Sequence, residues 1–540
     1  MSALLLALFA GTALGFRFIA AHQTLVPTVG GSYTEGLVGT PSYINPLYAS
    51  ASDVDNDLAH LIFSGLMRFD PQDGLTPDLA TSYTVSPDGK SYTFVLREGV
   101  TFHNDDPFTS EDVAFTIRAI QNPEYDSAVA ASFSGVVVET PDDRTVTFVL
   151  PEASTAFLSN LTIGILPSGV WSDVPASSSR LAILNLQPIG TGPFKFEKFT
   201  QDSRGTLRSM TLLRNKDYYR NAPYIQSLQF KFANTADELP NLLRNKNIEG
   251  AVTVPFTEAP KFSHDRSLSI LRPYIPQYTA AFFNLKSTGP LSDLNVRKAL
   301  DISLDKHAIV TNALGGNALP LNSPLVLNMP GALPADQIPA PDVAGAIAAL
   351  EAAGYKIPET GGARVKAGAA IVLNLSYADT PELKAVATEL KKQWDALGIT
   401  ITLQPKAPDE LQTDILRNRN FDILLAGELY GASRDPYPYW HSSQAVYPGL
   451  NITQLVSRAV DEAIGVIRSS TDEAKRTENY ALMSQALTEQ RVAAFLYEPS
   501  YVYVSSNRIK GINLPVVNLP SDRFADINEW YIKTKRVLKK

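Results

Sequence analysis

The sequence predicts an α/β fold of more than one domain, and two observations carry this prediction. The chain has 540 residues, more than a single hydrophobic core usually organises, so two to four domains are expected. Between Ile371 and Ala426, an alternating apolar run, an amphipathic helix pattern, a second alternating run and a short buried run follow one another. This β-α-β-α-β order is the unit of a parallel or mixed sheet.

The first third of the chain is predicted to be α+β with antiparallel strands. Turn sequences at Ser86-Pro87-Asp88-Gly89 and Pro141-Asp142-Asp143-Arg144 join strand-like runs, so hairpins are expected at residues 81–97 and 136–150. Thr109 to Asp112 resembles a capping box that opens a helix between them. Before the hairpins, a strand at residues 33–38 and a helix at residues 53–67 are expected.

Further elements follow in order. Residues 187–196 alternate proline and glycine ahead of an extended run, which suits a crossover between domains. Strands are expected at residues 207–214, 227–232 and 279–286, and Asp293 is a plausible cap for a helix at residues 293–305. Helices at residues 453–468 and 472–490 precede a strand-like run, residues 493–505, that is predicted to return the chain to its first sheet.

The β-α-β-α-β unit leads into an unusual segment, the aromatic loop, Gly427–Gln444. Thr380 caps the unit's first helix, with Pro381 at its first position and Gly398 after its end. A short helix at residues 409–418 then leads into the buried strand that ends at Ala426. The aromatic loop contains four Tyr or Trp residues, one Arg, one Asp, one Glu and one His. Ligands bind at strand ends in such sheets, so a binding loop is predicted, with a core-packed structural loop as the alternative.

Composition excludes several functions. The chain has no cysteine, so disulfides, cysteine-based zinc sites and a thiol nucleophile are absent. A formal net charge of −8 without a basic stripe argues against nucleic acid. No cofactor is expected, and His441 has no second histidine at metal spacing. Basic residues are in excess only at Lys533–Lys540, which is expected to be a solvated tail.

The N-terminus carries the only segment of membrane length. Ser2–Gly15 is apolar, and Phe16–Ala21 continues it with a single charge at Arg17. We interpret it as an export signal retained as a membrane anchor, with Ile19-Ala20-Ala21 as a weak cleavage site. A buried core helix is the alternative.

A series of short motifs recurs along residues 33–503 in the order found in a known family. They are Tyr43-Ile44-Asn45-Pro46-Leu47, Gly65-Leu66, Pro77-Asp78-Leu79-Ala80, Ser86-Pro87-Asp88-Gly89, Phe94-Val95-Leu96-Arg97, Phe102-His103, Asp112-Val113, Gly190-Thr191-Gly192-Pro193-Phe194, Phe283-Asn284, Val296-Arg297-Lys298-Ala299-Leu300, Phe421-Asp422 and Asp435-Pro436. Together they resemble the family 5 extracellular solute-binding proteins, the oligopeptide, dipeptide and nickel type that serve ABC importers.

The resemblance implies a two-lobed fold like that of the periplasmic binding proteins (class II, cluster C type) with an inserted α+β subdomain. Residues 1–26 would be the signal or anchor segment. Lobe I would combine residues 27–56, 186–278 and 497–540, and carry residues 57–185 as the inserted subdomain. Lobe II would run from residue 279 to 496, with hinges near Tyr278 and Tyr497.

The implied function is binding. The chain is expected to be a monomeric receptor at the extracytoplasmic face of the membrane that captures a short peptide and delivers it to an ABC permease. A sugar or a metal chelate is the alternative ligand. A hydrolase using Glu428 and Asp435 is less favoured, because neither a Gly-x-Ser-x-Gly elbow nor a phosphate-binding glycine loop appears.

Ligand contacts are expected from both lobes. Peptide binders of this family hold the ligand's α-amine with an Asp at the position that is Ala432 here, so Glu428 or Asp435 would have to replace it. Backbone groups of residues 427–433 are expected to pair with an extended peptide. The predicted contact residues are Tyr33, Glu35, Asn284, Glu428, Tyr430, Arg434, Asp435, Tyr437, Tyr439 and Trp440.

Overall fold

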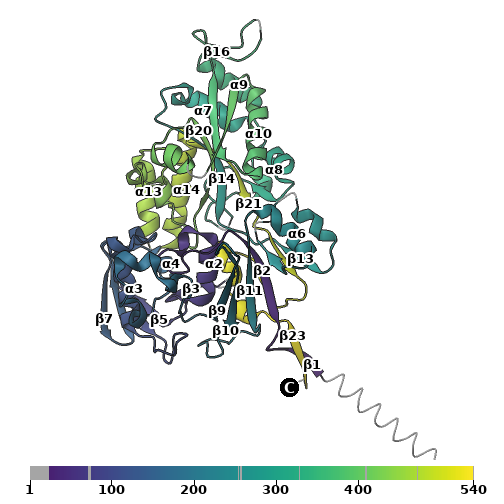
Figure 1. The fold of residues 1–540 in the computed structure, drawn as a ribbon. Coiled ribbons are helices and arrows are strands. Elements are labelled where there is room, and N and C mark those ends of the chain that lie inside the picture. Colours follow the sequence, from purple (N-terminus) through teal and green to yellow (C-terminus); the bar gives the residue numbers. More distant parts are fainter. Residues whose placement is uncertain are drawn as a thin grey trace, which may run out of the picture.

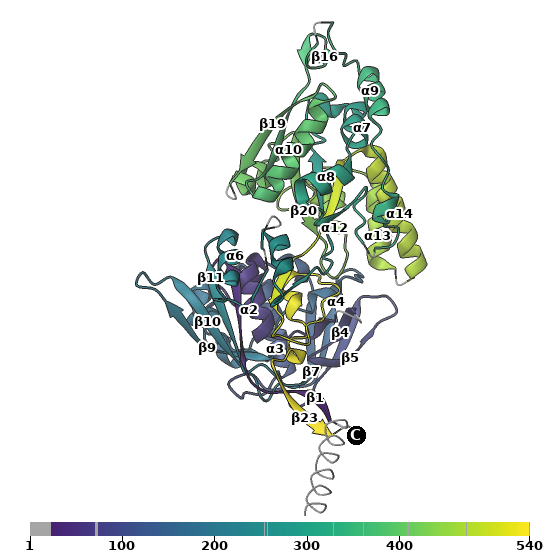
Figure 2. The ribbon, with the colours of Figure 1, turned by 90° about the vertical axis from the view of Figure 1, so that its right-hand side faces the viewer.

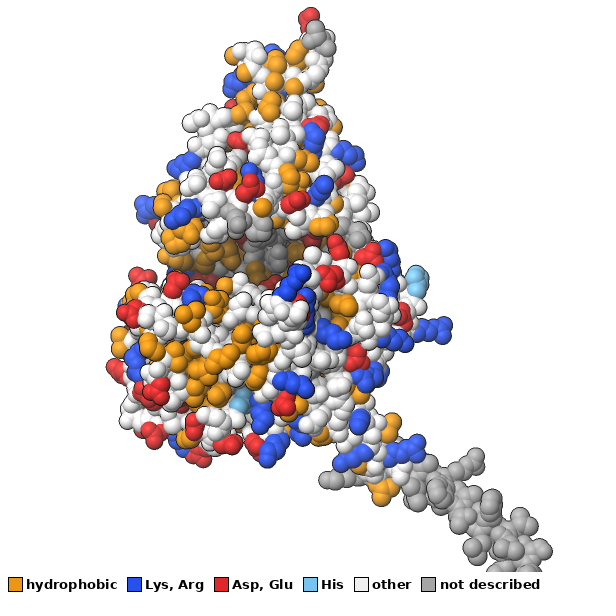
Figure 3. All heavy atoms as spheres, in the orientation of Figure 1, with side chains coloured by type: hydrophobic (Ala, Val, Ile, Leu, Met, Phe, Trp, Pro, Cys, Tyr) orange, Lys and Arg blue, Asp and Glu red, His pale blue; other side chains and the backbone are white. Residues whose placement is uncertain are grey.

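The computed structural model has two lobes (Figure 1), and the space-filling view shows a cleft between them (Figure 3). It describes residues 23–538 except 71–73, 253, 256–257, 328, 360, 408–409 and 471. The predicted signal or anchor segment, Ser2–Ala21, lies outside the described residues. Within them, every helix is too short or too polar to cross a membrane.

Lobe I is built on a seven-stranded mixed sheet. Its strand order is β13-β22-β12-β2-β11-β10-β9. The central strand, β2, is parallel to both of its neighbours, and the other pairs are antiparallel. The strands are β2 (Ser32–Val38), β9 (Phe194–Gln201), β10 (Leu207–Arg214), β11 (Ser227–Ala233), β12 (Gly250–Ala251), β13 (Leu268–Leu271) and β22 (Tyr503–Ser506).

The inserted subdomain contains the two predicted hairpins, joined in one antiparallel sheet of order β5-β6-β8-β7. Its strands are β5 (Ala80–Val85), β6 (Ser91–Leu96), β7 (Val137–Asp142) and β8 (Thr145–Val149). Helix α3 (Ser110–Gln121) begins at the predicted capping box, in which the backbone N–H of Thr109 donates to Asp112 at 2.8 Å. A smaller hairpin, β3 (Met67–Asp70) with β4 (Gly74–Pro77), precedes the sheet.

Helix α2 (Asp53–Ile62) ends five residues before the predicted position. The glycine-rich crossover explains the close packing at that end, because the N–H of Gly192 donates to the carbonyl of Ile62 at 2.8 Å. A Cβ at Gly190 would lie 2.1 Å from the same carbonyl oxygen, so only glycine fits there. The crossover therefore packs onto the helix that borders the cleft.

Lobe II is built on a six-stranded sheet of order β15-β21-β14-β20-β18-β19. The predicted β-α-β unit is confirmed, since β18 is parallel to both β19 and β20 and α10 follows β18. The short helix expected at residues 409–418 is a π-helical turn at Leu411–Arg417. The strands are β14 (Gln277–Phe283), β15 (Ala318–Pro320), β18 (Val372–Ala378), β19 (Thr400–Lys406), β20 (Ile423–Leu429) and β21 (Ala493–Pro499).

Helices cover both faces of the lobe II sheet, so it separates two hydrophobic cores. Alternate residues of β14 serve the two cores, with Phe283 on one side and Phe282 on the other. The helices of lobe II include α7 (Leu294–Ile302), α8 (Lys306–Leu314), α9 (Val343–Ala352), α10 (Pro381–Asp395), α12 (Tyr437–Trp440), α13 (Arg458–Ser469) and α14 (Glu473–Gln490).

The two ends of the described chain form an antiparallel ribbon. Strand β1 (Gln23–Thr28) pairs with β23 (Lys533–Leu538). The ribbon projects from lobe I on the side away from lobe II, as both views show (Figures 1 and 2). The C-terminal basic run was predicted as a solvated tail. Residues 533–536 are exposed to solvent, but residues 533–538 form a strand paired along its whole length with β1 and not a tail.

Candidate functional site

A cavity of about 340 Å³ lies between the lobes. Its lining includes stretches that are far apart in the sequence, among them α2 with the residues that follow it, residues 129–133 and 159–164 of the subdomain, residues 430–433 of lobe II, and residues 518–528 near the C-terminus. The cleft is visible as the dark opening between the two halves in Figure 3. A molecule in this cavity would contact both lobes.

The lobe I wall of the cavity includes a short 3-10 helix, η12 (Pro520–Phe524). Asp522 lines the cavity, and one of its oxygens accepts hydrogen bonds from the N–H groups of Asn518 at 2.9 Å and Leu519 at 3.0 Å. Burial raises the pKa of Asp522 to about 6, so the carboxylate is mostly ionised at neutral pH. The next residue, Arg523, lies on the other side of the turn and is fully buried.

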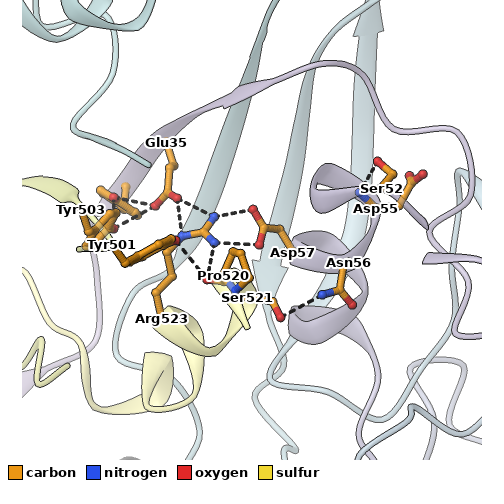
Figure 4. A network of polar contacts seen from close by, with 11 residues as sticks. Glu35, Ser52, Asp55, Asn56, Asp57, Tyr501, Tyr503, Pro520, Ser521 and Arg523 are labelled. Carbon is orange, nitrogen blue, oxygen red and sulfur yellow. Dashed lines mark hydrogen bonds and ion pairs between the residues drawn. The ribbon is translucent and has the colours of Figure 1, made fainter. Parts of the chain in front are cut away.

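Arg523 is the centre of a buried ionic network (Figure 4). Its guanidinium donates to Glu35 at 2.8 Å and to both oxygens of Asp57 at 2.7 and 2.6 Å. The other oxygen of Glu35 accepts from the hydroxyls of Tyr33 at 2.7 Å and Tyr503 at 2.9 Å. The network therefore joins β2, β22, α2 and η12, which fixes η12 against the lobe I sheet.

Tyr33 and Glu35, predicted as ligand contacts, belong to this network. Both side chains are fully buried, and neither residue lines the cavity. Burial raises the pKa of Asp57 to about 6, even though its contact with Arg523 favours the ionised form. The strand predicted for Tyr33 and Glu35 is confirmed as β2, but their side chains contact Tyr503 and Arg523.

Glu428, the first acid of the aromatic loop, is buried in lobe II. It lies on β20 opposite Tyr278 of β14, whose hydroxyl donates to it. Burial raises the pKa of Glu428 to about 8, although this hydrogen bond lowers it, so the side chain is mostly neutral at pH 7. It is absent from the cavity lining.

Four consecutive residues of the aromatic loop, 430–433, form the lobe II wall of the cavity. Tyr430 packs against Tyr278 and Tyr439, each with ring centroids 5.6 Å away, and its backbone N–H donates to Pro276 at 2.9 Å. Gly431 has a φ of 65°, which lets the backbone turn along the cavity. Ala432 follows, so this wall offers backbone and small side chains.

The two charged residues that follow, Arg434 and Asp435, contact protein partners. Arg434 donates to the carbonyl of Gly431 at 2.6 Å and to the side-chain oxygen of Asn518, in lobe I, at 2.7 Å. Asp435 forms an ion pair of 3.1 Å with Arg468. The structure thus brings Arg434 to the boundary between the lobes, where its side chain spans the cleft, whereas Asp435 is paired within lobe II.

The remaining aromatic residues of the loop pack into lobe II. Trp440 is 1% exposed and lies against Phe282 and Phe495. The hydroxyl of Tyr439 donates to the carbonyl of Leu429 at 2.6 Å. The ring of Tyr437 is stacked by the guanidinium of Arg468, 4.2 Å from its centroid. None of these three aromatic residues of the loop lines the cavity in the described structure.

Asn284 also has a local role. Its amide nitrogen donates to the carbonyls of Arg419 at 3.0 Å and Phe421 at 2.9 Å, beside the start of β20. Most of the cavity residues that the sequence did not single out lie in residues 46–78 and 129–164, and a further group lies in residues 518–528. Pro520 and Asp522 stand at the first and third positions of η12, which is a helix-start signal, but such a signal does not show where the turn lies.

Comparison with known proteins agrees with this geometry. The family model described as "Bacterial extracellular solute-binding proteins, family 5 Middle" matches residues 74–447. The oligopeptide-binding protein AppA of Bacillus subtilis is 25% identical over 515 residues, which cover 94% of this chain and 92% of that protein. A putative ABC transporter peptide-binding protein of Brucella ovis is 27% identical over 488 residues, 88% of each chain.

Solved structures share the whole fold. NikZ from Campylobacter jejuni in complex with Ni(L-His) is 26% identical, with a TM-score of 0.77 over 93% of this chain and 99% of that chain. AppA from B. subtilis in complex with a nonapeptide has the same TM-score at 24% identity, over 94% and 100% of the two chains. The predicted two-lobed α/β fold and the predicted family are confirmed. The chain belongs to the bacterial extracellular solute-binding proteins of family 5.

Proposed function

We propose that this solute-binding protein captures a short peptide in the cleft and presents it to the permease of an ABC importer. The observation that carries the proposal is a cavity lined by both lobes, at whose edge Arg434 and Asn518 meet. Relatives across nearly the whole chain are named as peptide-binding proteins. The protein binds its ligand without turnover, and Ser2–Ala21 anchors it at the extracytoplasmic face of the membrane.

The proposed mechanism is closure of lobe II onto lobe I. In the proposed division, lobe I comprises residues 27–56, 186–276 and 500–540, the subdomain residues 57–185, and lobe II residues 277–499, since the bounds 279 and 496 expected from the sequence fall inside β14 and β21. Strand β14 begins and β21 ends beside two short connections, so the chain crosses between the sheets only at these places within the described residues. A ligand that contacts both walls only in the closed state shifts the population toward it.

The ammonium of a peptide needs a carboxylate, because an unpaired buried charge is costly. Glu428 is mostly neutral at pH 7, and Asp435 is paired with Arg468. Two other acids line the cavity, Asp78 and Asp522. Burial raises the pKa of Asp78, but three arginines act in the opposite direction, so its surroundings are cationic and disfavour a second cation.

Asp522 is the carboxylate that we assign to the ligand's amino group. Its hydrogen-bond donors are backbone N–H groups, which orient the carboxylate without neutralising its charge. The ionic network around Arg523 holds the turn that carries it. Across the cavity, the backbone of residues 430–433 lies where it can pair with an extended peptide.

The test compares trialanine with N-acetyl-trialanine by calorimetry. Acetylation removes the ammonium, so the wild type should bind the acetylated peptide at least about tenfold more weakly, since hydrogen bonds to charged groups contribute about 1.5–3 kcal/mol. Asp522→Asn should lose this discrimination. Glu428→Gln is the matched control and should keep it, because Glu428 is already mostly neutral.

A second measurement tests the ligand class. Ligand at 100 times its dissociation constant should stabilise the protein by about 2.7 kcal/mol in thermal unfolding. Native mass spectrometry of freshly purified protein should show a co-purified peptide. A co-purified metal chelate or sugar, or cleavage of trialanine, would contradict the proposal. If free peptide binds and Asp522→Asn still discriminates, only the assignment of Asp522 fails.

A further inference from the structure

The β1–β23 ribbon has no role in the cleft, yet its composition is distinctive. Residues 533–540, KTKRVLKK, contain five basic residues and no acidic residue, in a chain whose formal net charge is −8. Lys533, Lys535 and Arg536 are exposed on β23. No ion pair of these three side chains occurs within residues 23–538 as described, so their charges are available to a partner.

The ribbon also exposes large apolar side chains. Leu25 on β1 is 62% exposed and Leu538 on β23 is 64% exposed. The register places Leu25 directly opposite Arg536, so an apolar and a cationic side chain share one face. A two-stranded ribbon by itself is only marginally stable in water, so contact with a further surface would stabilise it. Exposed leucines beside cations are typical of segments that lie at a membrane interface.

The position of the ribbon points to the same partner. The apolar stretch Ser2–Ala21 is separated from the start of β1 at Gln23 by one residue, His22. Figures 1 and 2 show the ribbon at the end of lobe I that is remote from lobe II. A bilayer that holds the apolar stretch would therefore lie next to β23 and its basic side chains.

We propose that the β1–β23 ribbon binds anionic phospholipid headgroups. Arg536 shares a face with Leu25 and Leu538 and pairs with phosphate groups there, while these two leucines enter the boundary between headgroups and acyl chains. Lys533 and Lys535 lie on the other face of the ribbon and add to its positive potential near the lipid surface. The inference rests on the proposed anchoring by Ser2–Ala21, which brings the ribbon to the surface. It adds a charge-dependent contact to an anchor whose own insertion depends on apolar residues.

The absence of cysteine makes a direct test available, because one introduced cysteine is the only labelling site. Thr534→Cys places a polarity-sensitive fluorophore on β23. Ala369→Cys is the matched control, since Ala369 is exposed on β17 (Ala369–Ala370), whose partner β16 (Val365–Lys366) lies at the far end of lobe II in Figure 1. The full chain is mixed with vesicles of phosphatidylcholine, or of phosphatidylcholine with phosphatidylglycerol.

The label at position 534 should shift to the blue on the anionic vesicles, and the label at position 369 should not. Raising the salt to about 1 M should reverse the shift, because the Debye length falls to about 3 Å. The triple variant Lys533→Gln, Lys535→Gln, Arg536→Gln should lower the ratio of anionic to neutral vesicle binding on the order of a hundredfold. The apolar anchor contributes to binding of both kinds of vesicle, so its contribution cancels in this ratio.

The outcomes separate the ribbon from the anchor. Vesicle binding is measured by flotation. Equal binding to both kinds of vesicle, with unchanged emission from the label at position 534, would overturn the ribbon proposal but not the anchor proposal. Flotation with anionic vesicles alone, with a shifted label, would support the ribbon and contradict the anchor. The triple variant should keep the wild-type melting temperature, since the three side chains are exposed. If the triple variant is unfolded, Arg536→Gln alone replaces it and should lower the ratio of anionic to neutral vesicle binding about fivefold.

Discussion

The two walls of the cavity are held in place by different kinds of interaction. On the lobe I side, η12 is fixed by a buried arginine between two carboxylates. On the lobe II side, the aromatic loop is fixed by Trp440 and its neighbouring rings, together with the mostly neutral Glu428. Charge therefore positions one wall and apolar packing positions the other.

Residue type alone does not show which side chains of this chain line the cavity. The aromatic loop has many side chains suited to binding, but most of them support the loop itself and leave residues 430–433 to face the cavity. The turn η12 looks ordinary in sequence, yet it brings a carboxylate to the cavity. Removing one partner of a buried charge pair is strongly destabilising, whereas the stability cost of trimming a packed ring grows with the volume that is lost.

The largest expected effect comes from breaking the charged wall. Arg523→Met should destabilise the protein by about 5 kcal/mol, the upper end of the range for breaking a buried ion pair, because it leaves the carboxylates of Glu35 and Asp57 buried without a cation. Denaturant unfolding would measure the loss. Adding Glu35→Gln and Asp57→Asn should recover much of it, and a failure of this rescue would show that packing, rather than charge, holds η12.

On the packed wall, the loss of stability should depend on the side-chain volume that a substitution removes. Trp440→Ala should cost about 3–5 kcal/mol of stability, since the indole is buried between aromatic rings. Peptide affinity of the remaining folded protein should change little, because Trp440 does not line the cavity. Trp440→Phe should retain most of the stability. A large loss of affinity at unchanged stability would instead place the indole in the site.

The neutral acid of the packed wall makes stability depend on pH. The folded-state pKa of Glu428 is raised from 4.5 to about 8, so its contribution is full below pH 4.5 and is lost as the pH rises through 8. The free energy of unfolding of Glu428→Gln, relative to that of the wild type, should therefore rise by about 1.4 kcal/mol for each pH unit across this window. Unfolding at constant ionic strength would measure it, with the exposed Glu478→Gln as a control for the loss of one surface carboxyl group.

The smallest effect concerns the contact that joins the two walls. Arg434→Lys should lose the hydrogen bond to Asn518 and weaken peptide binding by about 1 kcal/mol, or about fivefold, because the closed state loses one interaction. Calorimetry would measure the dissociation constant, and the exposed Arg458→Lys serves as the control. Unchanged peptide affinity with a lowered melting temperature would show that Arg434 stabilises the loop and does not contribute to peptide binding.

Local patterns predicted much of the fold. The hairpins, α3 and the β18-α10-β19 unit follow from turn residues, caps and apolar periodicity, all of which act over a few residues. The site depends on contacts that such patterns cannot contain. Glu35 and Arg523 are 488 positions apart, and Trp440 has the same residue type whether it faces a ligand or a core. The sequence could therefore locate the loop but not the direction of its side chains.

The pairing of Arg523 with Glu35 and Asp57 also has a consequence for the order of folding. Synthesis proceeds from the N-terminus, so the residues that complete lobe I appear after nearly all others. The portion from β14 to β21 is continuous in sequence, so its sheet can form before Arg523 has been synthesised to pair with Glu35 and Asp57. Contacts that close such long loops slow assembly, so truncation before Arg523 would leave a nascent protein with one finished half and one unfinished half.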